Sequence, residues 1–394
     1  MKRRRMRAVR PSFVVAGGLL IVGLIAAIIV GSDDEPGSAA VGGSFEEVLA
    51  AAGGQTVRFW MWGGDAALND HIDEDVAPAA KELGITLTRV PIEDTADALA
   101  RIAAEVDAGA DDGSVDLVWV NGTNFAQGRD ARLWLRGWTD RLPSFELLDP
   151  DDPTLTLDFG VPVEGQELPW SRAAFVFAHD SAAVPDPPRT FEELAAWVRA
   201  HPGRFTYPAP PDFTGSAFVR QAVQALGEEE AFTFLDELEP HLWRDGKSRP
   251  VDQAELDRLF ASGEVDLAMS YNPNFVDTAV RTGRFPSSAR PYVFEGGSLQ
   301  NVSFVAIPVT AGSAAGAQVV ADLLLSPAMQ AAKLDRVGIP TVLDPDRLES
   351  GARSRFLRTP AGSHRLDDFG AALVELPVAE VPRLDRRWIG EVGS

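Results

Sequence analysis

The stretch Gly113-Ser-Val-Asp-Leu-Val-Trp-Val-Asn-Gly-Thr-Asn-Phe125 decides the fold, because the chain repeats it as Gly263-Glu-Val-Asp-Leu-Ala-Met-Ser-Tyr-Asn-Pro-Asn-Phe275. Gly, Val, Asp, Leu, Asn and Phe recur at one constant offset. In each copy a short apolar run follows a helical pattern and ends in Asn, Gly or Pro, which is typical of a buried parallel strand that leads into a loop. Open α/β sheets bind ligands at the carboxyl ends of such strands. The repeat therefore predicts an α/β fold of two lobes, each presenting a polar loop to a shared cleft.

Alternating strand and helix patterns surround both copies. Apolar runs at 55–62, 85–90 and 115–120 alternate with amphipathic helices, which predicts parallel pairing with right-handed crossovers. The runs at 173–178 and 302–307 are the two expected crossings between lobes. A chance repeat is the alternative, since Val-Asp-Leu strands are common, but spacing, flanking helix and the closing Asn-Phe pair all agree. We expect the first lobe at 44–175 plus 303–394 and the second at 176–302.

Composition favours a folded two-domain protein that is not a nucleic-acid binder. The 394 residues are 45% hydrophobic and 24% charged, enough to bury a sizeable core. Residues 1–10 hold six of the 36 Lys and Arg and no acid, so the rest of the chain carries 30 basic and 58 acidic residues. That net charge of -28 repels phosphate backbones. With no cysteine, the chain can form neither a disulfide nor a lipid-modified N-terminal Cys.

The N-terminus has the pattern of a membrane anchor. Residues 1–12 are basic, 13–30 are uncharged and apolar, and 31–43 are a polar linker rich in Gly, Ala and Asp. Eighteen residues make about 27 Å of helix, close to the hydrocarbon thickness of a bilayer. The charge pattern places the basic end in the cytoplasm and the remainder on the extracytoplasmic face. The alternative is a signal sequence cut near Ser38-Ala-Ala40, which would free the protein into the periplasm.

No enzyme signature is present in the sequence. Gly-x-Ser-x-Gly and His-Glu-x-x-His are both missing, and the five His are scattered without metal-ligand spacing. We therefore expect no catalysis, no metal and no cofactor. The alternative is an extracytoplasmic hydrolase that uses paired cleft carboxylates, Asp65 with Asp212 or Asp277.

The loops that follow the strands suit the binding of a small molecule. Aromatic faces beside a few amides and hydroxyls make such a site, and aromatic faces near Asp65, Asp212 or Asp277 would suit an organic cation. The N-terminus of the helix expected from Ala217 offers free N–H groups to a polar ligand group. The predicted ligand-binding residues are Trp60, Trp62, Gly63, Gly64, Asp65, Asn121, Gly122, Asn124, Trp170, Tyr207, Thr214, Gly215, Ser216, Tyr271 and Asn272.

Several of these residues have a structural alternative. Trp60 and Trp62 point to the same side of one strand, so both could pack into the core; Trp119, inside a buried strand, favours the core. Asn121 and Asn272 could simply cap turns. Thr214-Gly-Ser216 could be ordinary helix capping.

The same segments resemble a known family. Phe59-Trp-Met-Trp-Gly-Gly64, Asp116-Leu-Val-Trp-Val-Asn-Gly122, Gly203-Arg-Phe-Thr-Tyr-Pro-Ala-Pro-Pro-Asp-Phe-Thr-Gly-Ser216, residues 266–273 and Leu323-Leu-Leu-Ser-Pro327 resemble the extracytoplasmic solute-binding proteins of ABC importers, most closely the YnjB-type subgroup. The resemblance runs from about 55 to 345. It implies a type II periplasmic-binding-protein fold with two hinge crossings, which closes on a small solute and hands it to a permease driven by an ATPase. It names no solute, and we expect the protein to act as a monomer.

Overall fold

The computed structural model describes residues 43–357 and 371–393. The predicted basic segment 1–12 and anchor 13–30 lie outside these ranges. Within them, no helix is both long and apolar enough to cross a membrane.

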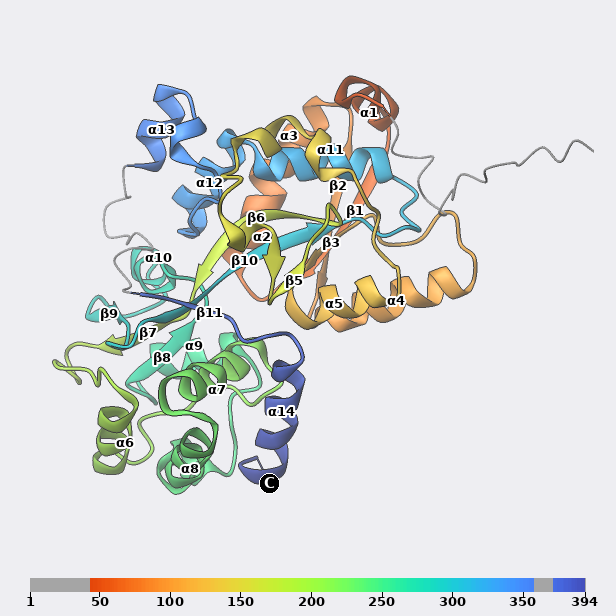
Figure 1. The fold of residues 1–394 in the computed structure, drawn as a ribbon. Coiled ribbons are helices and arrows are strands. Elements are labelled where there is room, and N and C mark those ends of the chain that lie inside the picture. The colour runs from red at the N-terminus through yellow and green to blue at the C-terminus, as the bar shows by residue number, and fades with distance from the viewer. Residues whose placement is uncertain (1–42, 358–370, 394) are drawn as a thin grey trace, which may run out of the picture. The chain divides into compact units, whose positions relative to one another are not determined.

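The first sheet contains the first copy of the repeated strand. Strand β1 (Thr56–Trp62) lies between β2 (Thr86–Ile92) and β3 (Leu117–Val120) and pairs parallel with both, as the β-α pattern predicted. The long strand β10 (Ser298–Ala306) runs antiparallel to β3. Figure 1 shows β10 extending from this sheet toward the other lobe. Two further strands pair with β10, namely β6 (Glu167–Ala174) and β11 (Ala372–Val374).

Helices flank this sheet and begin where capping residues predict. Ser44 and Glu47 form the expected capping box of the first helix. Gly84, with φ +80°, ends the run of helix after β1 at a left-handed position that favours glycine. Ser326 caps the helix that begins with Pro327. The helices are α1 (Phe45–Ala52), α2 (Ala66–Asp70), a π-helical continuation (His71–Val76), α3 (Ala77–Glu82), α4 (Thr95–Asp107), α5 (Gly122–Asp130), α11 (Ala314–Leu325), α12 (Pro327–Val337) and α13 (Ser350–Phe356).

The second copy lies in a different sheet. Strand β7 (Val176–Asp180) pairs antiparallel with β8 (Leu267–Ser270), which carries the second copy, and with β9 (Ala289–Tyr292). The prediction of two lobes with one copy each is confirmed by this separation. A short hairpin, β4 (Leu157–Asp158) and β5 (Val161–Pro162), precedes β6. The remaining helices are α6 (Phe191–Ala200), α7 (Phe213–Leu226), α8 (Glu228–Leu238), α9 (Gln253–Ala261), α10 (Phe275–Arg281) and α14 (Glu380–Glu391).

Each sheet has its own hydrophobic core, and the C-terminal helix differs from our expectation. The first core takes residues from 48–170 and 302–348, and the second takes residues from 174–299 and 384–392. The chain changes core between Trp170 and Ala174, next to the expected crossing at 173–178, and again between Leu299 and Val302, just before the expected crossing at 302–307. Helix α14 was expected in the first lobe but packs into the second core, because Trp388 lies against Tyr207 with its ring centroid 6.2 Å away. Phe356 still packs against the first core, whereas Leu373 packs against the second.

Each copy carries an Arg-Asp fastening, which is an ion pair between a partly exposed Arg and a buried Asp. In the first lobe, Arg58 donates to Asp116 through Nε (2.7 Å) and Nη2 (3.0 Å), and Nη2 also reaches the carbonyl of Gly113 at 2.6 Å. In the second, Arg204 donates to Asp266 through Nε at 2.7 Å and through Nη2, while Nη1 reaches the carbonyl of Gly263 at 2.8 Å. In each lobe the Asp N–H also donates to the carbonyl of its Arg. The fastening holds the N-terminal end of each repeated strand in place. It thereby also determines where the C-terminal end of the strand leads into the following loop.

Candidate functional site

The loop after β1 holds three predicted residues, Gly63, Gly64 and Asp65, in a partly exposed position. Asp65 caps α2 by accepting the N–H groups of Ala67 (2.9 Å) and Leu68 (3.1 Å). A Cβ on Gly64 would meet the ring of Trp62 at 2.1 Å, so the loop lies directly against the indole. A Cβ on Gly63 would meet Pro91 at 2.8 Å.

The two Trp residues of β1 differ in their surroundings. Trp60 donates from its indole nitrogen to the carbonyl of Ser114 (3.1 Å) and packs against the first core, which matches the structural alternative. Trp62 lies edge-to-face with Trp119, their ring centroids 6.5 Å apart. Trp62, nearest the loop, is the better placed of the pair to contact a ligand.

The loop after β3 begins α5 at Gly122, which has φ +57°. Its N–H donates to the carboxylate of Asp158, and the ring of Phe159 lies 3.4 Å from where a Cβ would be. Asn121 occupies the N-cap position, but its side chain makes no capping hydrogen bond. Asn124 lies half-buried in the first turn of α5.

Trp170 lies in the crossing strand and is buried, with 1% of its surface exposed. The pairing of β6 with β10 shifts register at this residue. Its carbonyl instead accepts from Gln330 (2.7 Å) and from the Nζ of Lys333, both on α12. In this conformation Trp170 supports the hinge strand.

The helix start at Thr214-Gly-Ser216 combines capping with a close backbone approach. The carboxylate of Asp212 accepts the N–H groups of Thr214 (2.9 Å) and Gly215 (3.0 Å). A Cβ on Gly215 would lie 2.0 Å from the carbonyl oxygen of Pro208. The hydroxyl of Thr214 donates to Gln253 (3.0 Å), whose amide donates to Asp257 (2.7 Å). The capping alternative therefore accounts for these two N–H groups, and the side chains lead to an unpredicted carboxylate.

Three other predicted residues of the second lobe contact the C-terminal segment. The hydroxyl of Tyr207 accepts from the indole of Trp388 at 3.0 Å. Ser216 donates to Asp385 at 2.6 Å. Tyr271 donates to Glu375. All three predicted residues are buried, so the segment after residue 371 covers part of the predicted surface.

The end of the second copy contacts the first lobe. The amide of Asn272 donates to the carbonyl of Val337 (3.3 Å), and that of Asn274 donates to the carbonyl of Gly338 (2.7 Å). Thr278 donates to Val337 as well, at 3.1 Å. The C-terminal end of α12 therefore lies against the loop that follows β8.

A second contact between the lobes joins the two strand ends. The ring of Phe159, which lies on Gly122, is 5.6 Å from the guanidinium carbon of Arg220 on α7. Arg220 in turn pairs with Glu375, the acceptor of Tyr271. Gly122 and Tyr271, which occupy adjacent places in the two copies, are thus joined by one continuous set of contacts.

Burial raises the pKa of several carboxyl groups near these loops. It raises the pKa of Asp158 to about 8, that of Asp212 to about 6 and that of Asp257 to about 7. The charge of Asp65, from the first lobe, adds to the rise for Asp257 in the second. A positive charge placed beside any one of these carboxyl groups would lower its pKa.

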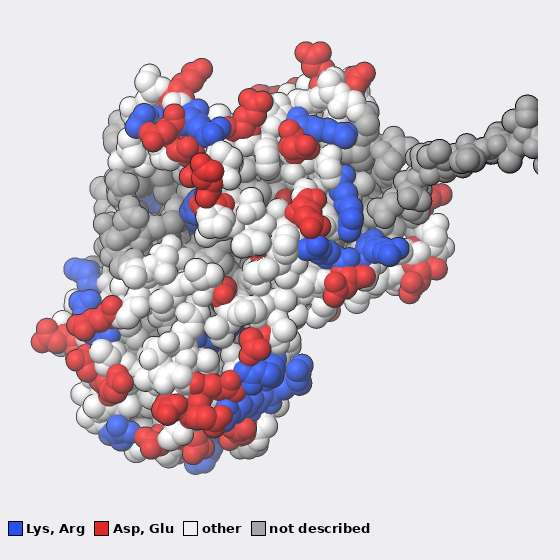
Figure 2. Space-filling model, in the orientation of Figure 1, with Lys and Arg blue, Asp and Glu red and all other residues white. Residues whose placement is uncertain are grey.

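Other acidic residues are paired or lie on the surface. Figure 2 shows charged side chains gathered over the outer parts of both lobes, with a largely uncharged band between them. On the second lobe, Arg383 and Arg387 of α14 join Glu228 and Glu229 of α8. In the described ranges, no group of three or more His, Cys, Asp or Glu could hold a metal ion.

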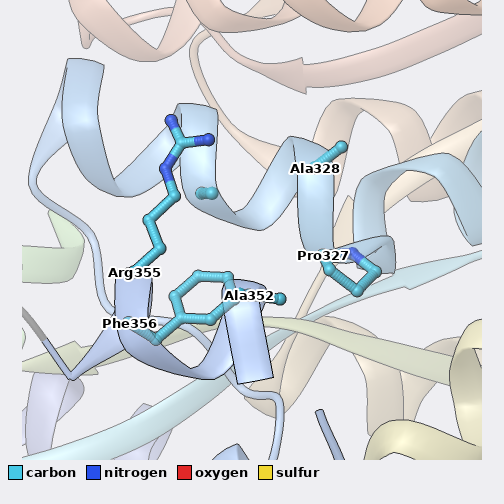
Figure 3. Close-up of a pocket in the computed structure, with 7 residues that line it drawn as sticks. Pro327, Ala328, Ala352, Arg355 and Phe356 are labelled. Carbon is cyan, nitrogen blue, oxygen red and sulfur yellow. The ribbon is translucent and has the colours of Figure 1, made fainter. Parts of the chain in front are cut away.

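Two surface pockets lie away from the predicted residues. One lies between α12 and α13, where Figure 3 shows Arg355 extending toward α12 beside Phe356. The other lies between α8 and α14. No predicted ligand-binding residue lines either pocket.

The fold, two α/β lobes joined by crossing strands, is that of periplasmic binding proteins. The periplasmic binding protein AfuA of Actinobacillus pleuropneumoniae, described with bound fructose-6-phosphate, matches with a TM-score of 0.65 and 15% identity, over 86% of this chain and 99% of its own. A periplasmic thiamin binding protein matches with a TM-score of 0.62 and 18% identity, over 86% and 95%. A putative spermidine/putrescine ABC transporter protein of Listeria monocytogenes matches with 0.62 and 16%, over 84% and 98%.

The sequence shows the family. Residues 76–344 match the family of bacterial extracellular solute-binding proteins, and the chain belongs to it. It is 37% identical over 364 residues to protein YnjB of Escherichia coli strain K12, over 87% of this chain and 92% of that protein. The predicted role, a solute-binding component of an ABC importer, follows from this membership together with the fold, which give the hydrolase alternative no support.

Proposed function

We propose that this protein captures its solute between the two lobes, at the loops that end the repeated strands. The proposal rests on one observation above the others: Gly122 of the first lobe and Tyr271 of the second belong to one contact network through Phe159 and Arg220. Bending at the crossing strands would open and close this region, driven by the solute's higher affinity for the closed form. The predicted residues that are not buried in one core, namely Trp62, Gly63, Gly64, Asp65, Asn121 and Asn124, would line the closed site with Asn272, which lies where the lobes meet.

The solute carries a positively charged group. Support comes from Asp65 in the first lobe and Asp257 in the second, since burial and the charge of Asp65 both raise the pKa of Asp257 and a cation would relieve that penalty. Trp62, three residues before Asp65, would offer an aromatic face to the same cation.

The protein performs no covalent chemistry and needs no cofactor. The pairs of carboxylates expected for a hydrolase lack support. Asp65 raises the pKa of Asp257, which belongs to neither pair, and the carboxylate of Asp212 caps α7.

Residues 13–30 anchor the protein at the extracytoplasmic face of the membrane, where a monomer delivers solute to the permease and ATPase subunits; a protein cut near residue 40 would act in the periplasm. The first lobe comprises 44–175 and residues from 303, and α14 joins 176–302 in the second. Tethering raises the local concentration at the permease.

The test is a screen of thiamine, choline, putrescine and spermidine by thermal unfolding and Trp fluorescence. A bound solute raises the melting temperature and changes the emission of Trp62. The variant Asp257→Asn weakens both responses, while Glu230→Gln, on the exposed side of α8, leaves them unchanged. A panel with no response in either signal contradicts the proposed cation.

A further inference from the structure

Arg220 of α7 is built as a receptor for one carboxylate. Its Nε and Nη2 donate to the two oxygens of Glu375, at 2.8 and 3.0 Å, and its Nη1 donates to the hydroxyl of Ser216 at 2.7 Å. Only 1% of the Arg220 surface is exposed. Such a two-point pair fixes the orientation as well as the charge of the bound group.

Neighbouring side chains complete this receptor. The hydroxyl of Tyr271 donates to the same carboxylate. Two aromatic rings lie near the guanidinium, Phe213 from the second lobe at 5.8 Å and Phe159 from the first at 5.6 Å. Apart from Phe159, the receptor belongs to the second lobe, and it adjoins the interlobe loops because Phe159 also touches Gly122.

The carboxylate that fills the receptor comes from a different part of the chain. Glu375 is 155 residues from Arg220. It follows β11, a strand of three residues that pairs with β10 and whose Val374 is 77% exposed. The same segment touches the first lobe, where the N–H of Val378 donates to the carbonyl of Phe159 at 3.1 Å. The segment is held by the pairing of β11 with β10, by Gln224, which donates to the carbonyl of Val374 at 2.8 Å, and by Leu373 and Leu376, which pack against the second core.

We propose that Arg220, Tyr271 and Ser216 form a carboxylate-binding subsite between the lobes, and that Glu375 occupies it as an internal competitor. Removing one member of a buried ion pair leaves an uncompensated charge, so Arg220 does not stay empty. Exchange of Glu375 for a carboxylate from outside keeps Arg220 paired. The role of this exchange in solute capture rests on the proposed function, and a solute with an ammonium and a carboxylate would satisfy both parts of the site.

The test uses the full chain with Glu375→Ala and formate or acetate as the probe. The substitution lowers the melting temperature, because Arg220 loses its partner. Formate and acetate raise it again, and more than chloride does at equal ionic strength; the rise grows with the logarithm of the anion concentration once that concentration exceeds the dissociation constant. The double variant Glu375→Ala with Arg220→Met shows no such difference between anions.

Asp266→Ala is the matched control, because it leaves Arg204, which lies outside the proposed subsite, without its carboxylate partner. A larger carboxylate response of Glu375→Ala than of this control supports the subsite. An equal carboxylate response of the two variants, or no response, overturns the proposed subsite. The Arg220–Glu375 pair would then be a structural ion pair that external carboxylates do not enter. Should Glu375→Ala fail to fold, Glu375→Gln is measured by the same anion titration and judged by the same criterion. Since no solute is used, the result is independent of whether the proposed solute capture is correct.

Discussion

Both lobes carry the Arg-Asp fastening, but its Asp is more deeply buried and accepts more hydrogen bonds in the first lobe than in the second. Asp116 is fully buried and accepts two further N–H groups, from Arg58 at 2.8 Å and from Ser313 at 3.0 Å. Asp266 retains 7% exposure, and its carboxylate pairs with Arg204. Ser313 precedes α11, so the first fastening also ties the sheet to a helix almost 200 residues away. The fastening therefore links distant parts of the chain in the first lobe, whereas in the second lobe the carboxylate of Asp266 pairs with Arg204.

The largest effect separates the two Asp residues. Asp116→Ala costs about 3–5 kcal/mol of the free energy of unfolding, the range for breaking a buried pair. Asp266→Ala costs less, about 1–2 kcal/mol, because it removes the partner of Arg204, whereas Asp116→Ala also leaves the N–H groups of Arg58 and Ser313 without their acceptor. Urea unfolding of both variants measures the difference. Equal losses would show that the two fastenings are equivalent after all.

Glycines in the two binding loops give the next effect. Gly215→Ala places its Cβ against the backbone carbonyl of Pro208, which cannot move aside, and costs about 1–3 kcal/mol. Gly64→Ala meets the side chain of Trp62, which can rotate, and costs less than about 1 kcal/mol. Thermal unfolding compares the two. A costlier Gly64→Ala would mean that Trp62 is held rigidly, contrary to its half-buried position.

The pH dependence compares Asp65 with Asp257. The folded chain holds a proton on Asp257 up to about pH 7, whereas its ordinary pKa is 3.8. Its contribution therefore makes the solute-free fold less stable as pH rises from about 4 to about 7. Binding of a cation strengthens about tenfold between pH 6 and 8, as this carboxylate ionises.

Asp257→Asn removes most of this dependence, and Asp65→Asn lowers the pH at which it occurs. Calorimetric titration at several pH values measures both. A pH-independent affinity in the wild type would exclude Asp257 from the cation's surroundings.

The smallest effect concerns the paired Trp residues of β1. Trp62→Phe removes most of the fluorescence response to solute, and Trp60→Phe leaves the response intact, because Trp60 packs against the core. Stability changes stay small in the half-buried Trp62 case. A response that survives Trp62→Phe and disappears in Trp60→Phe would reverse the assignment.

The sequence predicted the features that depend on local pattern. The three first-lobe strands, the capping residues Ser44 and Ser326, and the separation of the two copies follow from periodicity and from side chains that bond their own helix. The shared Arg escaped notice because Arg58 is 58 residues from Asp116, whereas Arg204 is 62 residues from Asp266, so a constant offset does not align them.

The candidate site could be predicted only in part. Loop residues were found because they follow strands, but no local pattern reveals that Tyr207, Ser216 and Tyr271 contact the C-terminal segment. That arrangement depends on packing between residues more than a hundred positions apart. Arg220 alone had a local signal, since it lies one helical turn after Ser216 on α7.

The interlobe distance tests the central claim most directly. The chain has no cysteine, so Lys81→Cys on α3 and Glu230→Cys on α8, both exposed, give two spin-label sites and no others. The distance between the two spin labels is then measured by double electron–electron resonance, with and without a cation that the thermal screen has shown to bind. The account predicts a shorter and narrower distance distribution with the solute. An unchanged distance distribution at saturating solute would contradict the closure of the two lobes on the solute.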